Sequence, residues 1–190
     1  MTINQRSFVK FTNYLKNLAL LLLVVFITTK CDIIKELTTE PVPRAGETNP
    51  SRPSSTKEIA LRNDIVAYAK KYQGIKYKAA GKTPSTGFDC SGFTSYVMNH
   101  FEIDLSPSSQ TQAKQGFSKT IEAVEPGDLI FFRRGKNDPI FHVAMVVSND
   151  KKSLKVIHST SRGVVVDDLL ASEYWKPKID SARDVVEKAL

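Results

Sequence analysis

The stretch Phe88-Asp89-Cys90-Ser91-Gly92-Phe93 is the most informative part of this 190-residue chain. It places one cysteine after a loop rich in Gly and Pro, at the start of an amphipathic stretch that runs from Ser91 to Phe101. The apolar residues of that stretch recur at helical spacing, so we expect a helix that begins near Cys90. A cysteine in the first turn of a helix lies at the positive end of the helix dipole, which favours the thiolate and lowers the pKa of the thiol. The alternative is a structural cysteine that packs like a small apolar residue.

The order of the expected elements indicates an α+β domain. The first helix should begin at Ser55, because Ser55-Thr56-Lys57-Glu58 fits a capping box. A short third helix is expected over 108–115, and beyond Pro126-Gly127 the apolar period changes from that of helices to that of strands. The expected strands are 128–132, 141–147, 154–158 and 163–166, with 182–186 a fifth strand or a closing helix. Helices followed by strands predict helices packed on an antiparallel sheet, and roughly 135 residues suffice for one core.

Two of the three histidines lie in these expected strands. His142 comes near the start of one strand and His158 at the end of the next, both among apolar residues. Neighbouring antiparallel strands can present both imidazoles on one face, together with the other even-numbered residues of the first strand, and a helix packed across that face could then deliver Cys90. His100 lies ten residues beyond Cys90 and is expected to be a surface or packing residue.

A cysteine, a nearby imidazole and a polar group that orients it are the requirements of cysteine catalysis. Cys90, His142 and His158 can meet them, although each histidine taken singly can equally be a partly buried packing residue. A zinc site made by the same three side chains is a further alternative, but no C-x-x-C pair or H-E-x-x-H motif supports it.

The first 30 residues differ in composition from the rest of the chain. They carry four Lys or Arg residues and no acidic residue, and Leu18 to Ile27 is an unbroken apolar run of ten. This pattern predicts a secretory signal over 1–30, because the run is shorter than the roughly 20 residues of a membrane span; an uncleaved signal anchor is the alternative. Without this segment 23 basic residues face 20 acidic ones, so the net charge falls from +7 to +3. A remainder this mildly basic does not argue for a nucleic-acid partner.

Cys31 follows the apolar run closely, as the lipidated cysteine of a bacterial lipoprotein does. The resemblance predicts a lipid anchor at Cys31 that holds the protein at a membrane, although Lys30 stands where such sites usually have a small residue. Residues 31–54 are rich in Pro, Thr and Ser and are expected to be a disordered tether, which leaves 55–190 as the folded domain. A disulfide between Cys31 and Cys90 is the alternative; a lipidated Cys31 leaves Cys90 unpaired.

A series of motifs in this chain resembles a known family. In chain order the motifs are Tyr77, Phe88-Asp89-Cys90-Ser91-Gly92-Phe93, Leu105-Ser106-Pro107-Ser108-Ser109-Gln110, Pro126-Gly127-Asp128-Leu129-Ile130-Phe131-Phe132, His142-Val143-Ala144-Met145-Val146 and Ile157-His158. The series is similar to the NlpC-type family of bacterial cell-wall cysteine peptidases, and it covers about residues 58–190. The resemblance implies a reduced papain-like core. It also implies that Cys90 is the nucleophile, that His142 is the general base and later the acid, and that His158 is the third member that fixes the imidazole tautomer.

The resemblance also implies residues around the nucleophile. The backbone N–H of Cys90 would help to bind the oxyanion, and Tyr77 matches the family tyrosine near that site. Asp89 and Ser91 flank the nucleophile and would contact polar groups of the peptide. The alternatives are that Tyr77 is a packed aromatic residue and that Asp89 caps the helix.

The chain is therefore expected to be an exported, lipid-anchored peptidoglycan endopeptidase of the periplasm. It would hydrolyse amide bonds of murein stem peptides or cross-links through a thioester, without a metal or organic cofactor. An amidase or acyltransferase on the same core, and a catalytically inert wall-binding lipoprotein, are the alternatives. The scissile bond, the choice of membrane, the oligomeric state and any regulatory partner do not follow from the residues.

Overall fold

A computed structural model describes residues 55–187 of the chain. The predicted signal segment, Cys31 and the tether lie outside the described residues. The elements are α2 (Thr56–Lys70), β1 (Lys82–Thr83), β2 (Gly87–Phe88), α3 (Cys90–Asn99), α4 (Ser109–Gln112), β3 (Phe117–Lys119), η2 (Ile121–Ala123), β4 (Leu129–Phe132), β5 (His142–Asn149), β6 (Leu154–Thr160), β7 (Gly163–Asp168), η3 (Lys176–Lys178) and β8 (Ile179–Asp184). Among these helices none is long and apolar enough to cross a membrane.

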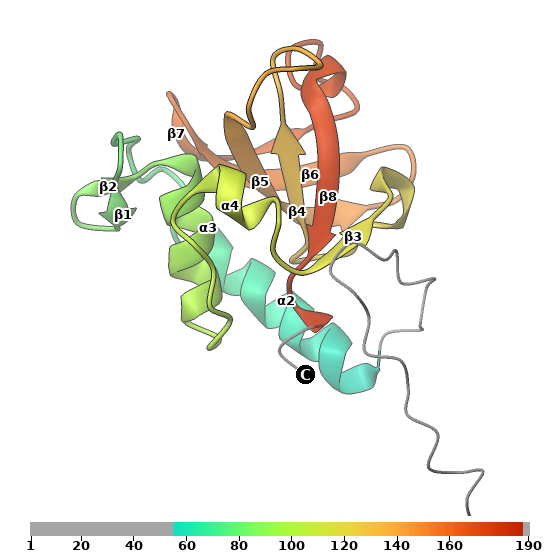
Figure 1. The fold of residues 1–190 in the computed structure, drawn as a ribbon. Coiled ribbons are helices and arrows are strands. Elements are labelled where there is room, and N and C mark those ends of the chain that lie inside the picture. The colour runs from blue at the N-terminus through green and yellow to red at the C-terminus, as the bar shows by residue number, and fades with distance from the viewer. Residues whose placement is uncertain (1–54, 188–190) are drawn as a thin grey trace, which may run out of the picture. The chain divides into compact units, whose positions relative to one another are not determined.

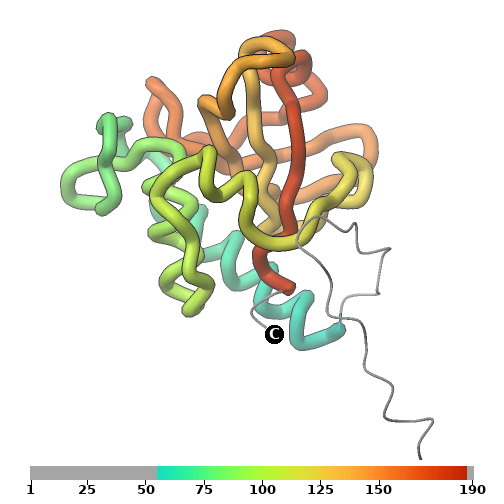
Figure 2. Tube along the Cα trace, viewed as in Figure 1, coloured from blue at the N-terminus to red at the C-terminus, as the bar shows by residue number. Residues whose placement is uncertain are grey.

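Six of the strands form one antiparallel sheet in the order β3-β8-β4-β5-β6-β7. Figures 1 and 2 show β3 and β8 side by side although they are far apart in the sequence. The four strands expected between 128 and 166 are confirmed, and the C-terminal element is a strand rather than a helix. β3 and the small β1–β2 hairpin were not expected. They consist of two or three residues each, which is too short for a period to stand out.

The helix starts follow the expected capping chemistry. Ser55 caps α2, and its hydroxyl accepts a hydrogen bond from the N–H of Glu58 at 3.1 Å. Asp89 caps α3, and its carboxylate accepts the N–H of Gly92 at 2.6 Å. Both contacts satisfy an N–H that has no partner within its helix. The helix expected over 108–115 is the single turn α4.

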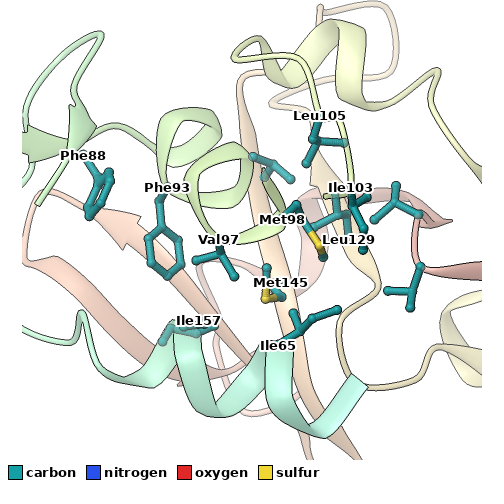
Figure 3. Packing of buried hydrophobic residues seen from close by; sticks show 14 of the residues in the cluster. Ile65, Phe88, Phe93, Val97, Met98, Ile103, Leu105, Leu129, Met145 and Ile157 are labelled. Carbon is teal, nitrogen blue, oxygen red and sulfur yellow. The ribbon is translucent and has the colours of Figure 1, made fainter. Parts of the chain in front are cut away.

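Apolar side chains pack on both faces of the sheet. On one face Ile65 of α2 and Phe93, Val97 and Met98 of α3 meet the odd-numbered residues of β5 and β6, among them Met145 (Figure 3). On the other face lie their even-numbered neighbours, with Trp175 packed against them. His142, Ala144 and Val146 share this second face, as predicted. The helices therefore cover the face opposite to His142, and the expectation that α3 crosses the histidine face is wrong.

A buried ion network joins α2 to the sheet. Arg62 is 2% exposed, and its guanidinium donates to Glu58 at 2.9 Å, to Asp128 at 2.7 Å and to Asp184 at 2.5 Å. The ammonium of Lys119 lies 3.1 Å from Asp128 and 3.2 Å from Asp184. Each charged group thus contacts at least one group of opposite charge, which lowers the cost of its burial. The aspartate of the Pro126-Gly127-Asp128 turn has this structural role.

Candidate active site

Cys90 is the first residue of α3 and lines a cleft of about 740 Å³. The loop before the helix approaches it closely, since the N–H of Asp89 donates to the carbonyl of Gly81 at 3.0 Å. A Cβ on Gly92 would lie 2.1 Å from that same carbonyl oxygen. Only glycine fits two residues after the cysteine, which explains physically why the Asp-Cys-Ser-Gly motif ends as it does.

The environment of the Cys90 sulfur combines burial with several hydrogen-bond donors. Burial raises the pKa of the thiol, and the charge of nearby Asp89 adds to the rise. The backbone N–H groups of Val143, Ser91 and Cys90 itself bond to the sulfur and lower its pKa, but by less. The expectation that the helix start lowers this pKa is therefore wrong for the free protein. The donors are present, but desolvation outweighs them, and the resting group is a thiol.

The sheet brings the two predicted histidines together. His142 begins β5 and His158 lies in β6, with exposed fractions of 6% and 0%. Nε2 of His142 and Nδ1 of His158 are 3.0 Å apart and share a hydrogen bond. Because the N–H of Val143 bonds to the sulfur of Cys90, the thiol lies at the start of β5, next to His142. Cys90 thus lies near the start of β5 and lines the same cleft as His142, although its helix packs on the opposite face of the sheet.

Both imidazoles are neutral near pH 7. Burial, and to a smaller extent the charge of His158, lower the pKa of His142 to about 3. Burial also lowers the pKa of His158, although the hydrogen bond and the charge of Asp167 partly oppose this. A neutral imidazole beside a thiol is a base that can take the thiol proton when a substrate binds.

Asp167 was not identified from the sequence. Its Oδ2 lies 3.0 Å from Nε2 of His158, and the guanidinium of Arg162 contacts the same oxygen. The sequence does hold a signal, which is the β6–β7 hairpin. His158 faces Val165 across the hairpin, so Asp167 lies on the same face, diagonally opposite His158.

Trp175 was also not identified from the sequence as a residue of the site. Its ring stacks on His142, with centroids 4.6 Å apart and planes 23° apart, and it lies 5.0 Å from the ring of His158. It follows β7 in an irregular segment, so no strand or helix period predicts where its ring lies. This ring covers the imidazole pair on the side of the cleft.

The residues expected around the nucleophile differ in where they lie. Tyr77 is 45% exposed and lines the cleft, and its pKa is raised by burial and by the nearby Cys90 and Asp89. The hydroxyl of Ser91 is turned into the protein, where it donates to the carbonyl of Pro107 at 2.8 Å. Asp89 is occupied as the helix cap and also accepts from Ser91 at 3.2 Å.

His100 takes no part in the cleft. It ends α3 and stacks on Tyr68, with ring centroids 3.8 Å apart, which confirms that it is a packing residue.

Within residues 55–187, one group of acidic ligand atoms is close enough to hold a metal ion, and it consists of Glu58, Glu125 and Asp184. Arg62 and Lys119 already contact these carboxylates and neutralise part of their negative charge. The alternative zinc set of Cys90 and the two histidines is not among such groups in this part of the chain.

A model of the NlpC/P60 family matches residues 74–184, which is more than half of the chain. The chain belongs to the NlpC/P60 family. The resemblance on which the site prediction rests is thereby confirmed. The family match includes Cys90, both buried histidines and Asp167, while their roles remain predictions.

Known relatives and structures are consistent with this membership. The chain is 35% identical over 124 residues to the gamma-DL-glutamyl hydrolase of Bacillus subtilis, which covers 64% of this chain and 29% of the relative. It is 28% identical over 135 residues to the murein DD-endopeptidase MepS/murein LD-carboxypeptidase of Escherichia coli strain K12, which covers 70% and 68%. The crystal structure of an NlpC/P60 family protein from Bacillus cereus superposes with a TM-score of 0.60 at 29% identity, over 66% of this chain and 40% of that one. The expected α+β, papain-like fold is confirmed, and the chain spans less than a third of the first relative.

Proposed function

We propose that this protein is a cysteine peptidase that hydrolyses amide bonds in peptidoglycan stem peptides or cross-links. The single observation that carries the proposal is that Cys90 and His142 line the same cleft, where His142 bonds to His158 at 3.0 Å. The names of the relatives, a glutamyl hydrolase and a murein endopeptidase, supply the substrate class.

The geometry supports the following sequence of steps. His142 takes the proton of the Cys90 thiol, and the sulfur attacks the carbonyl carbon to form a C–S bond. The oxyanion that results lies against the backbone N–H of Cys90, with Tyr77 at the edge of the cleft. His142 then gives its proton to the departing amine, which leaves a thioester. A water molecule, deprotonated by His142, hydrolyses the thioester and restores the thiol.

The raised pKa of the thiol and the lowered pKa of His142 each oppose proton transfer in the resting site, but each shift applies while the partner group is neutral. Proton transfer between them creates a thiolate and an imidazolium together, so the two new charges neutralise each other in a buried site. The three N–H groups that bond to the sulfur stabilise the thiolate once it forms.

The proposed location is outside the cytoplasm, at the cell wall. The basic and apolar segment 1–30 supports export, and Cys31 supports a lipid anchor followed by the tether 31–54. A lipid anchor would keep the domain near its polymeric substrate.

The test is mass spectrometry of purified peptidoglycan fragments incubated with the full-length protein. Cleavage by the wild type and complete loss of cleavage in Cys90→Ala are expected, and the product masses name the scissile bond. His100→Gln is the matched control, because this histidine packs on Tyr68 away from the cleft and should leave the rate unchanged. Equal cleavage by Cys90→Ala would refute the cysteine mechanism. No cleavage by a folded wild type would favour the acyltransferase alternative.

A further inference from the structure

We propose that Asp167 is a positioning residue that sets the direction of the hydrogen bond between His158 and His142, so that Nδ1 of His142 stays unprotonated toward Cys90. The proposal rests on the proposed function and adds a residue to its machinery. It is carried by the hydrogen bonds that join three groups, Asp167 on the edge strand β7, His158 and His142, in the cleft that Cys90 also lines.

The direction of each hydrogen bond follows from the one before it. A carboxylate only accepts, so Nε2 of His158 must carry a proton to bond to Asp167 at 3.0 Å. A neutral imidazole carries one proton, so Nδ1 of His158 is then an acceptor. The partner atom at 3.0 Å, Nε2 of His142, must therefore be the donor. The single proton of His142 is thus on Nε2, and Nδ1 is left with a lone pair.

Without Asp167 the same two imidazoles can hydrogen-bond in either direction. In the reverse direction Nδ1 of His158 donates to Nε2 of His142, and the proton of His142 moves to Nδ1. A protonated Nδ1 cannot take the proton of Cys90, so this state is inactive. The two states join the same pair of nitrogen atoms and differ only in which atom carries the proton. Packing of the rings therefore does not select between them.

Arg162, which also lines the cleft, contacts the carboxylate of Asp167. Its guanidinium contacts Oδ2 of Asp167, the oxygen that also accepts from His158, and its side chain is 59% exposed. The charged and titratable groups that face His158 are therefore His142 from β5, Asp167 from β7 and Arg162 from the hairpin turn. Asp167 raises the pKa of His158 and Arg162 lowers it. Removal of Asp167 should therefore lower this pKa, and removal of Arg162 should raise it.

The first measurement is ¹⁵N imidazole NMR of the full-length protein at pH 7, which reports the protonation of each ring nitrogen. In the wild type we expect both buried histidines to carry their proton on Nε2. In Asp167→Asn, whose amide can accept or donate, we expect a second population in which His142 carries its proton on Nδ1. Asp168→Asn is the matched control, because Asp168 bonds to Ser153 and to backbone N–H groups instead of a histidine. The His100→Gln background removes the third histidine signal.

The second measurement is the pH titration of the same signals, together with kcat/KM on peptidoglycan fragments. We expect Asp167→Asn to lower the pKa of His158 and Arg162→Gln to raise it. We expect kcat/KM to fall by about 10²-fold in Asp167→Asn and to be unchanged in Asp168→Asn. A residue that only holds the fold would shift the titration in neither of these opposite directions.

The two proposals fail in different ways. Unchanged histidine tautomers in Asp167→Asn, with an active wild type, would overturn the role of Asp167 and leave the peptidase proposal intact. A wild type that cleaves nothing would overturn the peptidase proposal, while the NMR experiment would still decide the direction of the hydrogen bond without any substrate.

Discussion

Two buried clusters of ionisable side chains differ in how their charges are balanced. The Arg62 cluster joins α2 to β4 and β8, and the imidazole cluster joins β5, β6 and β7. Both are almost inaccessible, since Arg62 is 2% exposed and His158 is 0% exposed. In the Arg62 cluster carboxylates face the cation directly. In the imidazole cluster the one carboxylate lies at the far end, on Asp167, and leaves His142 without an anionic partner in contact.

The difference appears in the pKa values. Burial lowers the pKa of Arg62, but Asp128 and Asp184 outweigh it and the net pKa rises, so this cation cannot lose its proton. Burial and the charge of His158 lower the pKa of His142 to about 3, and no group of opposite charge compensates them. A cluster in which opposite charges offset the cost of burial keeps its groups charged inside the fold, whereas a cluster without such partners holds neutral groups that can exchange a proton.

Breaking the Arg62 cluster should have the largest effect. Arg62→Met leaves Glu58, Asp128 and Asp184 buried without their main cation, and we expect the free energy of unfolding to fall by about 3–5 kcal/mol. Urea denaturation followed by circular dichroism measures this loss.

The control for this change is Arg133→Met. Arg133 pairs with Asp180 at 2.6 Å, but the two side chains are 35% and 27% exposed. A partly exposed pair should be worth less than about 1 kcal/mol. Equal losses in the two variants would show that the buried Arg62 cluster contributes no more to stability than a partly exposed ion pair.

The fold was predictable from the sequence because its main elements have clear local periods and caps. Ser55 and Asp89 mark helix starts by side-chain chemistry alone, and β4 to β7 each carry an apolar pattern. Cys90 and the two buried histidines were predictable because they lie in motifs with family spacing. The face that α3 covers was not predictable, since periodicity gives two faces of a strand without saying which one a helix occupies.

The residues that the sequence did not reveal are those whose role depends on a distant partner. Arg62 resembles any polar residue of an amphipathic helix until the fold brings Asp128 to it from the turn before β4 and Asp184 from the end of β8. Asp167 and Trp175 act on histidines in other elements. Such roles arise from tertiary contacts, which a local pattern does not contain. The sign of the Cys90 pKa shift was missed for the same reason, because burial is a tertiary property.

Acid titration of stability should isolate the contribution of His142. The pKa of His142 is about 3 in the folded protein against an ordinary 6.5, so below pH 6.5 the unfolded chain takes up a proton that the folded protein does not. The stability present above pH 6.5 should therefore be lost as the pH falls toward 3, at about 1.4 kcal/mol per pH unit. His142→Gln should remove this slope, as measured by denaturation at a series of pH values.

The two buried aspartates of the Arg62 cluster have opposite signs in the same titration. Burial raises the pKa of Asp184, but Arg62 and a backbone hydrogen bond outweigh it, so the net pKa is lowered and the contribution of Asp184 to stability is lost on acidification. Burial raises the pKa of Asp128, so its contribution to stability grows on acidification and is lost as the pH rises. The difference between wild type and His142→Gln isolates the histidine, because Asp128 is common to both proteins. His100→Gln is the control and should keep the wild-type slope. An identical slope in His142→Gln would show that His142 is already solvated or charged in the folded state.

The smallest effect is expected from the ring that covers the imidazole pair. Trp175→Leu removes the ring stacked on His142 and admits water to the imidazole. Since burial is the main cause of the lowered pKa of His142, we expect this pKa to rise toward 6.5 and kcat/KM to fall by about tenfold as the site becomes better solvated. Tyr174→Leu is the control, because Tyr174 is 55% exposed and contacts Trp175 rather than His142. If Trp175→Leu left the pKa of His142 unchanged, the sheet alone would exclude water from the imidazoles. The contrast with the Arg62 cluster would then depend on the missing counter-charges and not on the ring of Trp175.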